Sequence, residues 1–346
     1  MNSLQKKYTN PILWAAAGAG ALSATYTMLR RRRRYQFQNQ VVLLTGGSRG
    51  LGLVLARQLA RAGARLALCA RDGTELARAA AELRGLGAEV FTCVCDVTQR
   101  DQVENMVRAV HAQYGRIDTL INNAGVIQVG PLAVQTLQDF QDAMATHFWG
   151  PLYTTWAVLP EMRARRAGRI VNIASIGGKV AVPHLAPYCA SKFALAGLSA
   201  ALRAELASDG IVVTTVCPGL MRTGSHLNAI FKGQNKAEFA WFSIGNNSRL
   251  SSVSAERAAR EILRACQRGD AQLVISLPAE IAVWLQTAFP ELTAEILALT
   301  NRLLPGPGGI GEGHAFGHES VSGLTPAFLT NLIDEAALLN NEAPAR

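Results

Sequence analysis

The feature that most constrains this chain is an alternation, after residue 35, of short runs rich in Val, Ile and Leu with longer amphipathic stretches. This alternation is typical of βα units whose parallel strands are buried on both faces. It predicts an α/β fold with a doubly wound parallel sheet of about seven strands. The expected strands lie near 41–45, 65–70, 89–94, 118–122, 168–174, 211–216 and 272–276, and the expected helices near 50–62, 74–84, 100–114, 137–165 and 188–208.

Two segments depart from this alternation. Residues 223–252 mix Gly, Asn and Ser with aromatic residues directly after the sixth expected strand, and a connection of that length is often a functional lid. Beyond the last strand, an apolar helix interrupted by Pro290 is expected over 278–304, and a short helix over 325–340 follows a Gly/Pro linker. We therefore divide the chain into an N-terminal segment (1–35), a core domain (36–277) and a helical C-terminal extension (278–346).

The N-terminal segment is expected to attach the protein to a membrane. Residues 11–29 carry no charge, and as a helix these 19 residues would span about 28 Å, close to the thickness of a bilayer core. Five arginines follow at 30–34, and such a cluster stays on the cytoplasmic side of a membrane. We expect a membrane-anchor helix, spanning or lying in the interface, with the core domain facing the cytoplasm. The alternatives are a cleaved signal peptide and a non-membrane protein whose arginines act as a docking tag.

The net charge of +9 does not indicate nucleic-acid binding. Residues 1–40 contain seven Lys and Arg and no acidic residue, so this segment supplies +7 of the total. A nucleic-acid-binding domain would spread its basic residues over the folded part of the chain. The six cysteines lie mostly in apolar runs, without a CxxC pair or a Cys/His spacing, which indicates buried thiols in a reducing compartment and no metal site.

A glycine-rich turn joins the first expected strand to the first expected helix. Gly46 permits a tight turn, and Gly50 and Gly52 let the backbone and the helix N-terminus approach a diphosphate group without obstruction by a Cβ atom. Because it follows a buried strand, this turn predicts a Rossmann-type dinucleotide site. The residues expected to form it are Thr45, Gly46, Ser48, Arg49, Gly50, Leu51 and Gly52.

The cofactor is expected to be NADP(H). An NAD site would place a carboxylate at the end of the second strand to bind both ribose hydroxyls, but Ala70 stands there and Arg71 follows. Arg71 and Arg49 could converge on a 2′-phosphate, where charge-assisted hydrogen bonds of about 1.5 to 3 kcal/mol each would favour NADPH. Asp72 opposes this interpretation, because it could pair with Arg71 or bind the ribose itself. Arg71 could also simply cap a surface turn.

Two further turns at strand ends are candidates for contact with the cofactor. Asp96 and Val97 follow the third expected strand, where Asp96 could accept a hydrogen bond from the adenine amino group. Asn123, Ala124 and Gly125 follow the fourth, where small residues would let the backbone lie against the cofactor. Considered alone, either segment could be only a turn.

The candidate catalytic residues follow the fifth expected strand. Ser175 lies at its end, and Tyr188 comes thirteen residues later, four residues before Lys192. On a helix, Tyr188 and Lys192 share a face, so the ammonium group lies near the phenol. A nearby positive charge is expected to lower the phenol pKa from about 10 toward the working range, as general acid/base catalysis requires. A solvated helix face is the alternative explanation for the Tyr-x-x-x-Lys spacing alone.

Together these motifs resemble the short-chain dehydrogenase/reductase family over about residues 38–276. The matching motifs are Thr45-Gly46-x-x-x-Gly50-x-Gly52, Asn122-Asn123-Ala124-Gly125, Ser175, Tyr188-x-x-x-Lys192 and Pro218-Gly219 with Thr223. The resemblance implies hydride transfer between a nicotinamide and a carbonyl or alcohol carbon. It implies that Tyr188 exchanges the hydroxyl proton, that Ser175 binds the carbonyl oxygen, and that Lys192 holds the nicotinamide ribose and tunes Tyr188.

The resemblance has three further implications. Pro218, Gly219 and Thr223 would line the nicotinamide carboxamide and, like Tyr188 and Lys192, would contact the cofactor. An arginine in the glycine turn and another after the second strand also go with NADP(H) in this family. A homodimer or homotetramer through the helices at 137–165 and 188–208 is what the family suggests.

One position departs from the family's pattern. These enzymes often carry an asparagine on the helix after the fourth strand that helps to hold a proton-relay water. The matching place here, 22 residues past Gly125, is His147. Histidine can donate or accept a hydrogen bond, so His147 is a possible fourth catalytic residue, and a packed helix histidine is the alternative.

The expected function is therefore that of an NADP(H)-dependent oxidoreductase acting on a carbonyl or secondary alcohol. The expected anchor and the aromatic segment favour a lipophilic substrate, such as a sterol, retinoid, acyl or quinone-like compound. The alternative is a non-catalytic NADP(H)-binding sensor or assembly protein of the same fold. The presence of Ser175, Tyr188 and Lys192 argues against that alternative.

Overall fold

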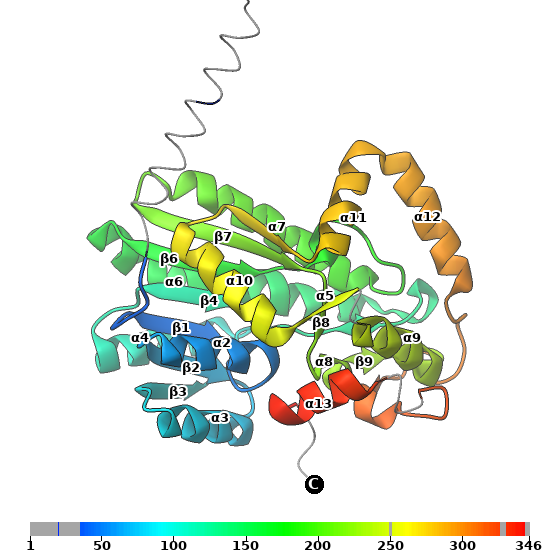
Figure 1. Cartoon of the computed structure of the whole chain (residues 1–346), viewed down its shortest axis with the longest axis horizontal. Helices are drawn as coiled ribbons and strands as arrows, with labels where there is room; N and C mark the ends of the chain where they lie inside the picture. Colours follow the sequence, from blue (N-terminus) through cyan, green and yellow to red (C-terminus); the bar gives the residue numbers. More distant parts are fainter. Residues whose placement is uncertain (1–19, 21–34, 249–250, 326–329, 343–346) are drawn as a thin grey trace, which may run out of the picture.

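Seven parallel strands form the central sheet of the computed structural model, which describes Gly20 and residues 35–248, 251–325 and 330–342 (Figure 1). Their order across the sheet is β11-β7-β6-β4-β1-β2-β3. The chain runs outward from β1 in one direction and builds the other half from β4, so a topological switch point lies between β1 and β4. The strands are β1 (Val41–Thr45), β2 (Arg65–Ala70), β3 (Val90–Val94), β4 (Thr119–Asn122), β6 (Gly168–Ile173), β7 (Ile211–Pro218) and β11 (Gln272–Ile275).

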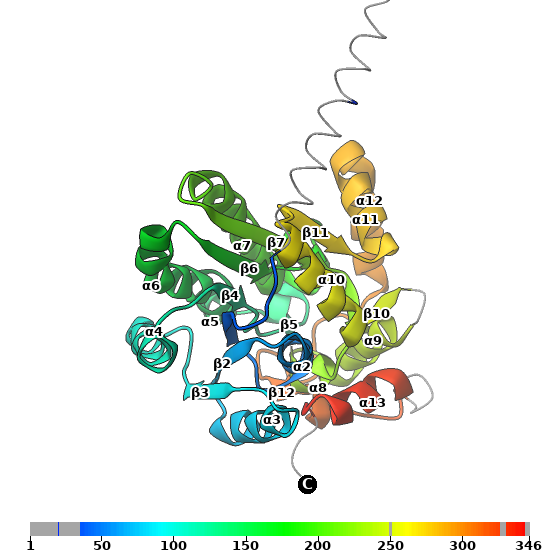
Figure 2. The same ribbon diagram turned by 60° about the vertical axis from the view of Figure 1, so that its left-hand side comes forward.

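Side chains of each strand alternate between the two faces of the sheet, and helices cover both faces (Figure 2). In β1, Val42 and Leu44 belong to one buried apolar cluster, while Val41 and Leu43 belong to another on the opposite face. The first cluster is completed by α2 (Gly50–Arg61), α3 (Gly73–Gly85) and α10 (Ala255–Arg268), and the second by α4 (Arg100–Tyr114), α6 (Gly150–Arg165) and α7 (Ala186–Glu205). The predicted doubly wound sheet is therefore confirmed.

The single helix expected over 137–165 is divided. It consists of α5 (Leu137–Met144), a π-helical turn (Ala145–Trp149) and α6. Pro151, near the start of α6, has no N–H to donate to the carbonyl of residue 147, so regular α-helical hydrogen bonding is interrupted there. The wider turn that results contains His147.

Within the segment 223–252, which was expected to be a lid, the described residues 223–248 and 251–252 form a packed wall. This wall contains α8 (Ser225–Asn228), β9 (Ile230–Phe231), α9 (Asn235–Asn247) and β10 (Ser252–Ser254), which pairs with β8 (Leu220–Arg222). Phe231, Phe239 and Phe242 are buried in one apolar cluster, against which Tyr188 at the start of α7 also packs. The aromatic side chains thus support the beginning of α7.

The C-terminal extension contains α11 (Leu277–Ala288), α12 (Pro290–Leu303) and α13 (Asn331–Leu339). Pro290 separates α11 from α12, which form a hairpin that stands away from the sheet (Figure 1). Between α12 and α13, β12 (Ala315–Phe316) pairs with β9, which also pairs with β5 (Gln128–Val129). The hairpin exposes a series of large apolar side chains: Leu277, Ile281, Trp284, Phe289, Leu292, Ile296, Leu299 and Leu303.

The described chain enters the core domain at the amino ends of the strands. Tyr35 Oη lies 2.9 Å from the hydroxyl of Thr119, the first residue of β4. The segment expected to be a membrane anchor, residues 1–35, lies outside the described residues apart from Gly20 and Tyr35. Among the helices that the structure describes, none combines the length and the apolar character needed to cross a bilayer.

Candidate functional site

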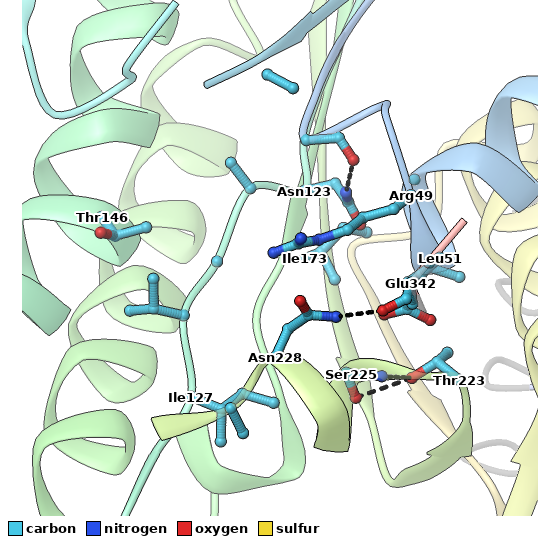
Figure 3. Close-up of a pocket in the computed structure, with 18 of the residues that line it drawn as sticks. Arg49, Leu51, Asn123, Ile127, Thr146, Ile173, Thr223, Ser225, Asn228 and Glu342 are labelled. Atoms are coloured by element: carbon cyan, nitrogen blue, oxygen red, sulfur yellow. Dashed lines mark hydrogen bonds between the residues drawn. The ribbon is translucent and has the colours of Figure 1, made fainter. Parts of the chain in front are cut away.

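A cavity of about 570 Å³ lies at the carboxyl ends of the strands, where open α/β sheets bind their ligands (Figure 3). All of the predicted site residues except Thr45 line this one cavity. They are Gly46, Ser48, Arg49, Gly50, Leu51, Gly52, Arg71, Asp96, Val97, Asn123, Ala124, Gly125, His147, Ser175, Tyr188, Lys192, Pro218, Gly219 and Thr223.

The glycine turn has no room for side chains, because neighbouring atoms already lie where their Cβ atoms would be. A Cβ atom at Gly52 would lie 1.9 Å from the backbone oxygen of Gly46. Gly50 has a φ of +56°, a conformation that residues with a side chain rarely adopt. Because α2 begins at Gly50, the positive end of its dipole faces the cavity. This cradle fits the diphosphate of a dinucleotide such as NADP(H).

Thr45 does not line the cavity, but it joins two of its walls. Its hydroxyl oxygen accepts hydrogen bonds from the backbone N–H groups of Asn123 at 3.0 Å and Ala124 at 3.1 Å. The side-chain amide of Asn123 donates in return to the carbonyls of Thr45 and Gly46, both at 3.1 Å. These bonds fix the end of β4 against the glycine turn across the switch point.

The two arginines expected to bind a 2′-phosphate have different surroundings. Nη1 of Arg49 donates to Glu75 Oε1 at 2.7 Å and forms an ion pair. Arg71 is exposed and, within the part of the chain that the structure describes, forms no hydrogen bond or ion pair. The Asp72 carboxylate caps α3 by accepting the backbone N–H of Glu75 at 2.9 Å, so it does not pair with Arg71.

The side chains of Asp96 and Thr223 each form hydrogen bonds with a residue two positions later in the sequence. Oδ1 of Asp96 accepts from the N–H and the hydroxyl of Thr98, both at 2.9 Å. The hydroxyl of Thr223 donates to Ser225 Oγ at 2.8 Å. Oδ2 of Asp96 is therefore the oxygen that could accept a hydrogen bond from a ligand.

Ser175, Tyr188 and Lys192 meet at one end of the cavity. Ser175 follows β6, and its Oγ accepts the N–H of Gly177 at 3.0 Å. Tyr188 and Lys192 lie on the first two turns of α7, with Lys192 Nζ 5.7 Å from the centre of the Tyr188 ring. Lys192 Nζ also donates to the carbonyl of Ile173 at 2.9 Å, which holds the amine between α7 and β6.

The expectation that Lys192 lowers the pKa of Tyr188 is not met in this structure. Burial raises the pKa of Tyr188 to about 12, and only the hydrogen bond with Ser175 opposes this change. Burial also lowers the pKa of Lys192 to about 7. The physical reason is the same for both groups, because enclosure away from water favours the neutral form of each.

His147 is buried in the π-helical turn, with its ring edge-on to Tyr188 at 5.4 Å between ring centres. Its Nε2 accepts the backbone N–H of Val126 at 3.1 Å, and its Nδ1 lies 2.8 Å from Ser191 Oγ. Because the Ser191 hydroxyl donates to the Tyr188 carbonyl at 2.8 Å, Nδ1 of His147 carries the proton of that contact. Burial and the nearby charge of Lys192 hold the pKa of His147 well below its usual range.

Ser191, Glu75 and Glu342 contribute to the site but were not predicted from the sequence. Ser191 lies three residues after Tyr188 on α7, and this helical spacing was the one local signal that could have pointed to it. Glu75 binds Arg49 and accepts a hydrogen bond from Ser48 Oγ at 3.2 Å. Glu342 lines the cavity from the C-terminal end of the described chain, and nothing in the sequence around it indicates this position.

Comparison with known proteins agrees with the geometry. The short chain dehydrogenase family matches residues 40–231. The chain is 45% identical over 185 residues to the granaticin polyketide synthase putative ketoacyl reductase 1 of Streptomyces violaceoruber, which covers 53% of this chain and 68% of that protein. It is 32% identical over 294 residues to dehydrogenase/reductase SDR family member 7B of Danio rerio, covering 82% of this chain and 93% of that protein.

Solved structures show the same relationship. Actinorhodin polyketide ketoreductase with NADPH has a TM-score of 0.62 and 33% identity, over 68% of this chain and 95% of that chain. A short-chain dehydrogenase/reductase from Burkholderia phymatum in complex with NAD has a TM-score of 0.69 and 26% identity, over 75% of this chain and 96% of that chain. With its sheet, its glycine turn and these relatives, the chain belongs to the short-chain dehydrogenase/reductase family of oxidoreductases.

Proposed function

We propose that this protein is an NADP(H)-dependent oxidoreductase that interconverts a carbonyl and a secondary alcohol. The observation that carries the proposal is that one cavity contains both the glycine turn and the side chains of Ser175, Tyr188 and Lys192. A bound nicotinamide would supply or accept the hydride. The remaining chemistry, binding and orienting the substrate oxygen and moving its proton, falls to the protein.

Tyr188 is suited to deliver the proton in the reducing direction. Burial raises its pKa to about 12, so at neutral pH the phenol keeps the proton that the substrate oxygen must receive. Ser175 binds the phenol and would bind the same substrate oxygen. When the phenol has lost its proton, a charged Lys192 at 5.7 Å would stabilise the phenolate.

NADP(H) is favoured over NAD(H) by the end of β2. Ala70 offers no carboxylate to the ribose hydroxyls, and Arg71 lies in the cavity wall with its guanidinium exposed. Arg49 is held nearby by Glu75 and could turn to a phosphate. The related ketoreductase with NADPH supports this preference, whereas the relative with NAD shows that the family uses both cofactors.

We also propose a lipophilic substrate and attachment to a membrane through residues 1–35, with the catalytic domain facing the cytoplasm. Support comes from the ketoacyl reductases among the relatives and from the α11–α12 hairpin, where Trp284 is 60% and Leu303 81% exposed. Fractionation of the full chain tests the attachment. A membrane-bound protein stays in the pellet through high-salt and carbonate washes, and release by salt alone would contradict an inserted anchor.

A homodimer or homotetramer through α6 and α7 is part of the proposal. Trp156 on α6 is 64% exposed and Phe193 on α7 is 45% exposed, which is typical of positions that a subunit interface covers. Light scattering of the detergent-solubilised protein should give a dimer or tetramer mass. The substitution Trp156→Glu should lower that mass toward the monomer.

The decisive experiment is NADPH oxidation by the full chain in detergent with sterol, retinal, acyl and aromatic carbonyls. Tyr188→Phe should reduce turnover by at least about 10²-fold and leave NADPH binding, followed by fluorescence titration, unchanged. NADPH binding without turnover of any carbonyl would favour the non-catalytic sensor. Failure to bind NADPH would overturn the proposed function itself.

A further inference from the structure

The C-terminal end of the described chain crosses the glycine turn. We call α13 together with residues 340–342 the C-terminal strap. The carbonyl of Asn340 accepts the backbone N–H of Gly50 at 2.9 Å, and the side-chain amide of Asn341 donates to the carbonyls of Ser48 at 2.9 Å and Glu75 at 3.2 Å. The strap is therefore bound directly to the backbone that forms the cradle.

Arginines of α2 and α3 hold the strap in this place. Arg57 of α2 donates to the carbonyl of Leu339 and to Oδ1 of Asn340, both at 2.8 Å. Arg78 of α3 donates to Oδ1 of Asn341 at 2.9 Å. Polar contacts from two helices and the glycine turn converge on three consecutive strap residues, so the end of the strap has one defined position.

Glu342 lies beside Leu51 of the glycine turn and is joined to Asn228 by a hydrogen bond (Figure 3). Its carboxylate lies against Gly50, where an added Cβ would be 2.8 Å from Oε1, and it accepts the N–H of Gly224. Its carbonyl accepts from the side-chain amide of Asn228 at 3.0 Å. A 5% exposed side chain thus bridges the glycine turn and the loop that follows Thr223.

The strap covers part of the glycine turn, where Asn340 binds the N–H of Gly50 and the Glu342 carboxylate lies against Gly50, but it leaves the rest of the cavity open. With the strap in place, the cavity still extends from Arg71 past the glycine turn to Tyr188, and Glu342 is part of its lining. Burial raises the pKa of Glu342 to about 8, so at neutral pH most molecules carry a neutral carboxyl group that can donate a hydrogen bond to a phosphate oxygen. A wall residue of this kind would not repel a diphosphate.

We propose that the C-terminal strap is part of the cofactor site, that Glu342 contacts the diphosphate of the bound dinucleotide, and that the strap must open before the cofactor can leave. The inference rests on the proposed NADP(H) function. It assigns a binding role to residues about 290 positions away from the glycine turn in the sequence. It also makes opening of the strap a step in cofactor exchange.

The test is the rate at which NADPH leaves the full-length protein, measured by stopped-flow fluorescence after addition of excess NADP⁺. Deletion of residues 331–346 should raise the dissociation rate constant by about tenfold or more, and Asn341→Ala should raise it several-fold. Glu335→Gln is the matched control, because Glu335 is exposed on the outer face of α13, and its rate should equal that of the wild type. Circular dichroism would verify folding, and Asn341→Ala carries the test if the deletion does not fold.

Two results would overturn the inference. Unchanged dissociation in Asn341→Ala and in the folded deletion would show that the strap only packs beside the site. Faster association or tighter binding with unchanged dissociation would show that the strap competes with the cofactor. If the wild type binds neither NADPH nor NADP⁺, the proposed function fails first, so the two failures are distinguishable.

Discussion

Nδ1 of His147 lies 2.8 Å from the hydroxyl of Ser191, and this contact joins the π-helical turn to the helix that carries Tyr188. The opposite ring nitrogen accepts the N–H of Val126, so both nitrogens of the imidazole have protein partners. An imidazole bound in this way has no free nitrogen for a relay. We interpret His147 as a positioning residue that sets the place of Tyr188.

This interpretation predicts a rate effect without a change in pH dependence. His147→Asn should lower kcat by about tenfold through displacement of Tyr188, with the pH profile of kcat unchanged above pH 6.5. Burial and the nearby charge of Lys192 hold the pKa of His147 well below its ordinary 6.5, so the wild-type imidazole is already neutral in that range. NMR of the imidazole C–H resonances checks this directly. A pH profile that shifts in His147→Asn would support a role for His147 in a proton relay. An unchanged kcat would mean that His147 only packs in the core and does not position Tyr188.

We expect the buried Lys192 to lower the free energy of unfolding, and we expect an apolar residue at this position to raise it again. Its pKa in the folded protein is about 7, below the ordinary 10.5, so below pH 7 the folded state must bury a charge. Lys192→Met should be inactive yet more stable by about 1 to 3 kcal/mol at pH 6, with the lost hydrogen bond to Ile173 offsetting part of the gain. Thermal denaturation should show the advantage shrinking as pH rises from 7 toward 10.5. An advantage that is independent of pH would mean that the pKa of Lys192 is not lowered in the folded protein.

The two glycines Gly52 and Gly197 should respond in opposite directions to the same substitution. Gly52→Ala places a Cβ 1.9 Å from the Gly46 oxygen, so the turn must distort, and we expect a loss of about 3 kcal/mol or more together with loss of NADPH binding. Gly197 is an exposed position in α7 with no atom within 4 Å of an added Cβ, so Gly197→Ala should stabilise by about 0.5 to 1 kcal/mol. Chemical denaturation of both variants checks this. Equal effects would contradict a steric role for Gly52.

The sheet could be predicted from the sequence because each of its strands is locally defined. The buried run Val41–Thr45 is uniformly apolar up to Thr45, and a glycine ends it, so its observed limits equal the predicted ones. The catalytic residues were found for a similar reason. Tyr188 and Lys192 are four residues apart on one helix, and Ser175 closely follows a strand, so short-range spacing identifies them.

What could not be predicted depends on contacts distant in sequence. The pKa values of Tyr188 and Lys192 depend mainly on how deeply the surrounding residues bury them, and for Tyr188 these include the apolar cluster of Phe231, Phe239 and Phe242. The four-residue spacing in the sequence shows only that the two groups lie near each other. No periodicity or motif in the sequence indicates the contact between Asn340 and Gly50. The partner of Arg49 was also missed, because Glu75 reaches it from the next helix, α3.

Cofactor preference should depend on Arg71. Arg71→Ala removes the exposed guanidinium beside the end of β2 and should raise KM for NADPH by about thirtyfold, as expected for loss of about 2 kcal/mol of charge-assisted binding. KM for NADH should change little. Arg61→Ala, at an exposed position at the end of α2, is the control for loss of one positive charge. Equal increases for NADPH and NADH would exclude a contact with the 2′-phosphate.

The docking of the strap should weaken as pH rises. The pKa of Glu342 in the folded protein is about 8, above its ordinary 4.5, mainly because burial favours the neutral carboxyl group. The negative charge of Glu75 also raises this pKa. The hydrogen bond from Gly224 and the positive charge of Arg49 lower it, but by less. The folded state therefore holds a proton that the unfolded state releases, so the contribution of Glu342 is complete below pH 4.5 and is lost as pH rises through 8. Hydrogen exchange of the peptide 331–342, corrected at each pH with Glu342→Gln, should show about tenfold less protection at pH 9 than at pH 6. The Gln variant cannot ionise, so identical pH dependence in both proteins would show that Glu342 does not control the strap.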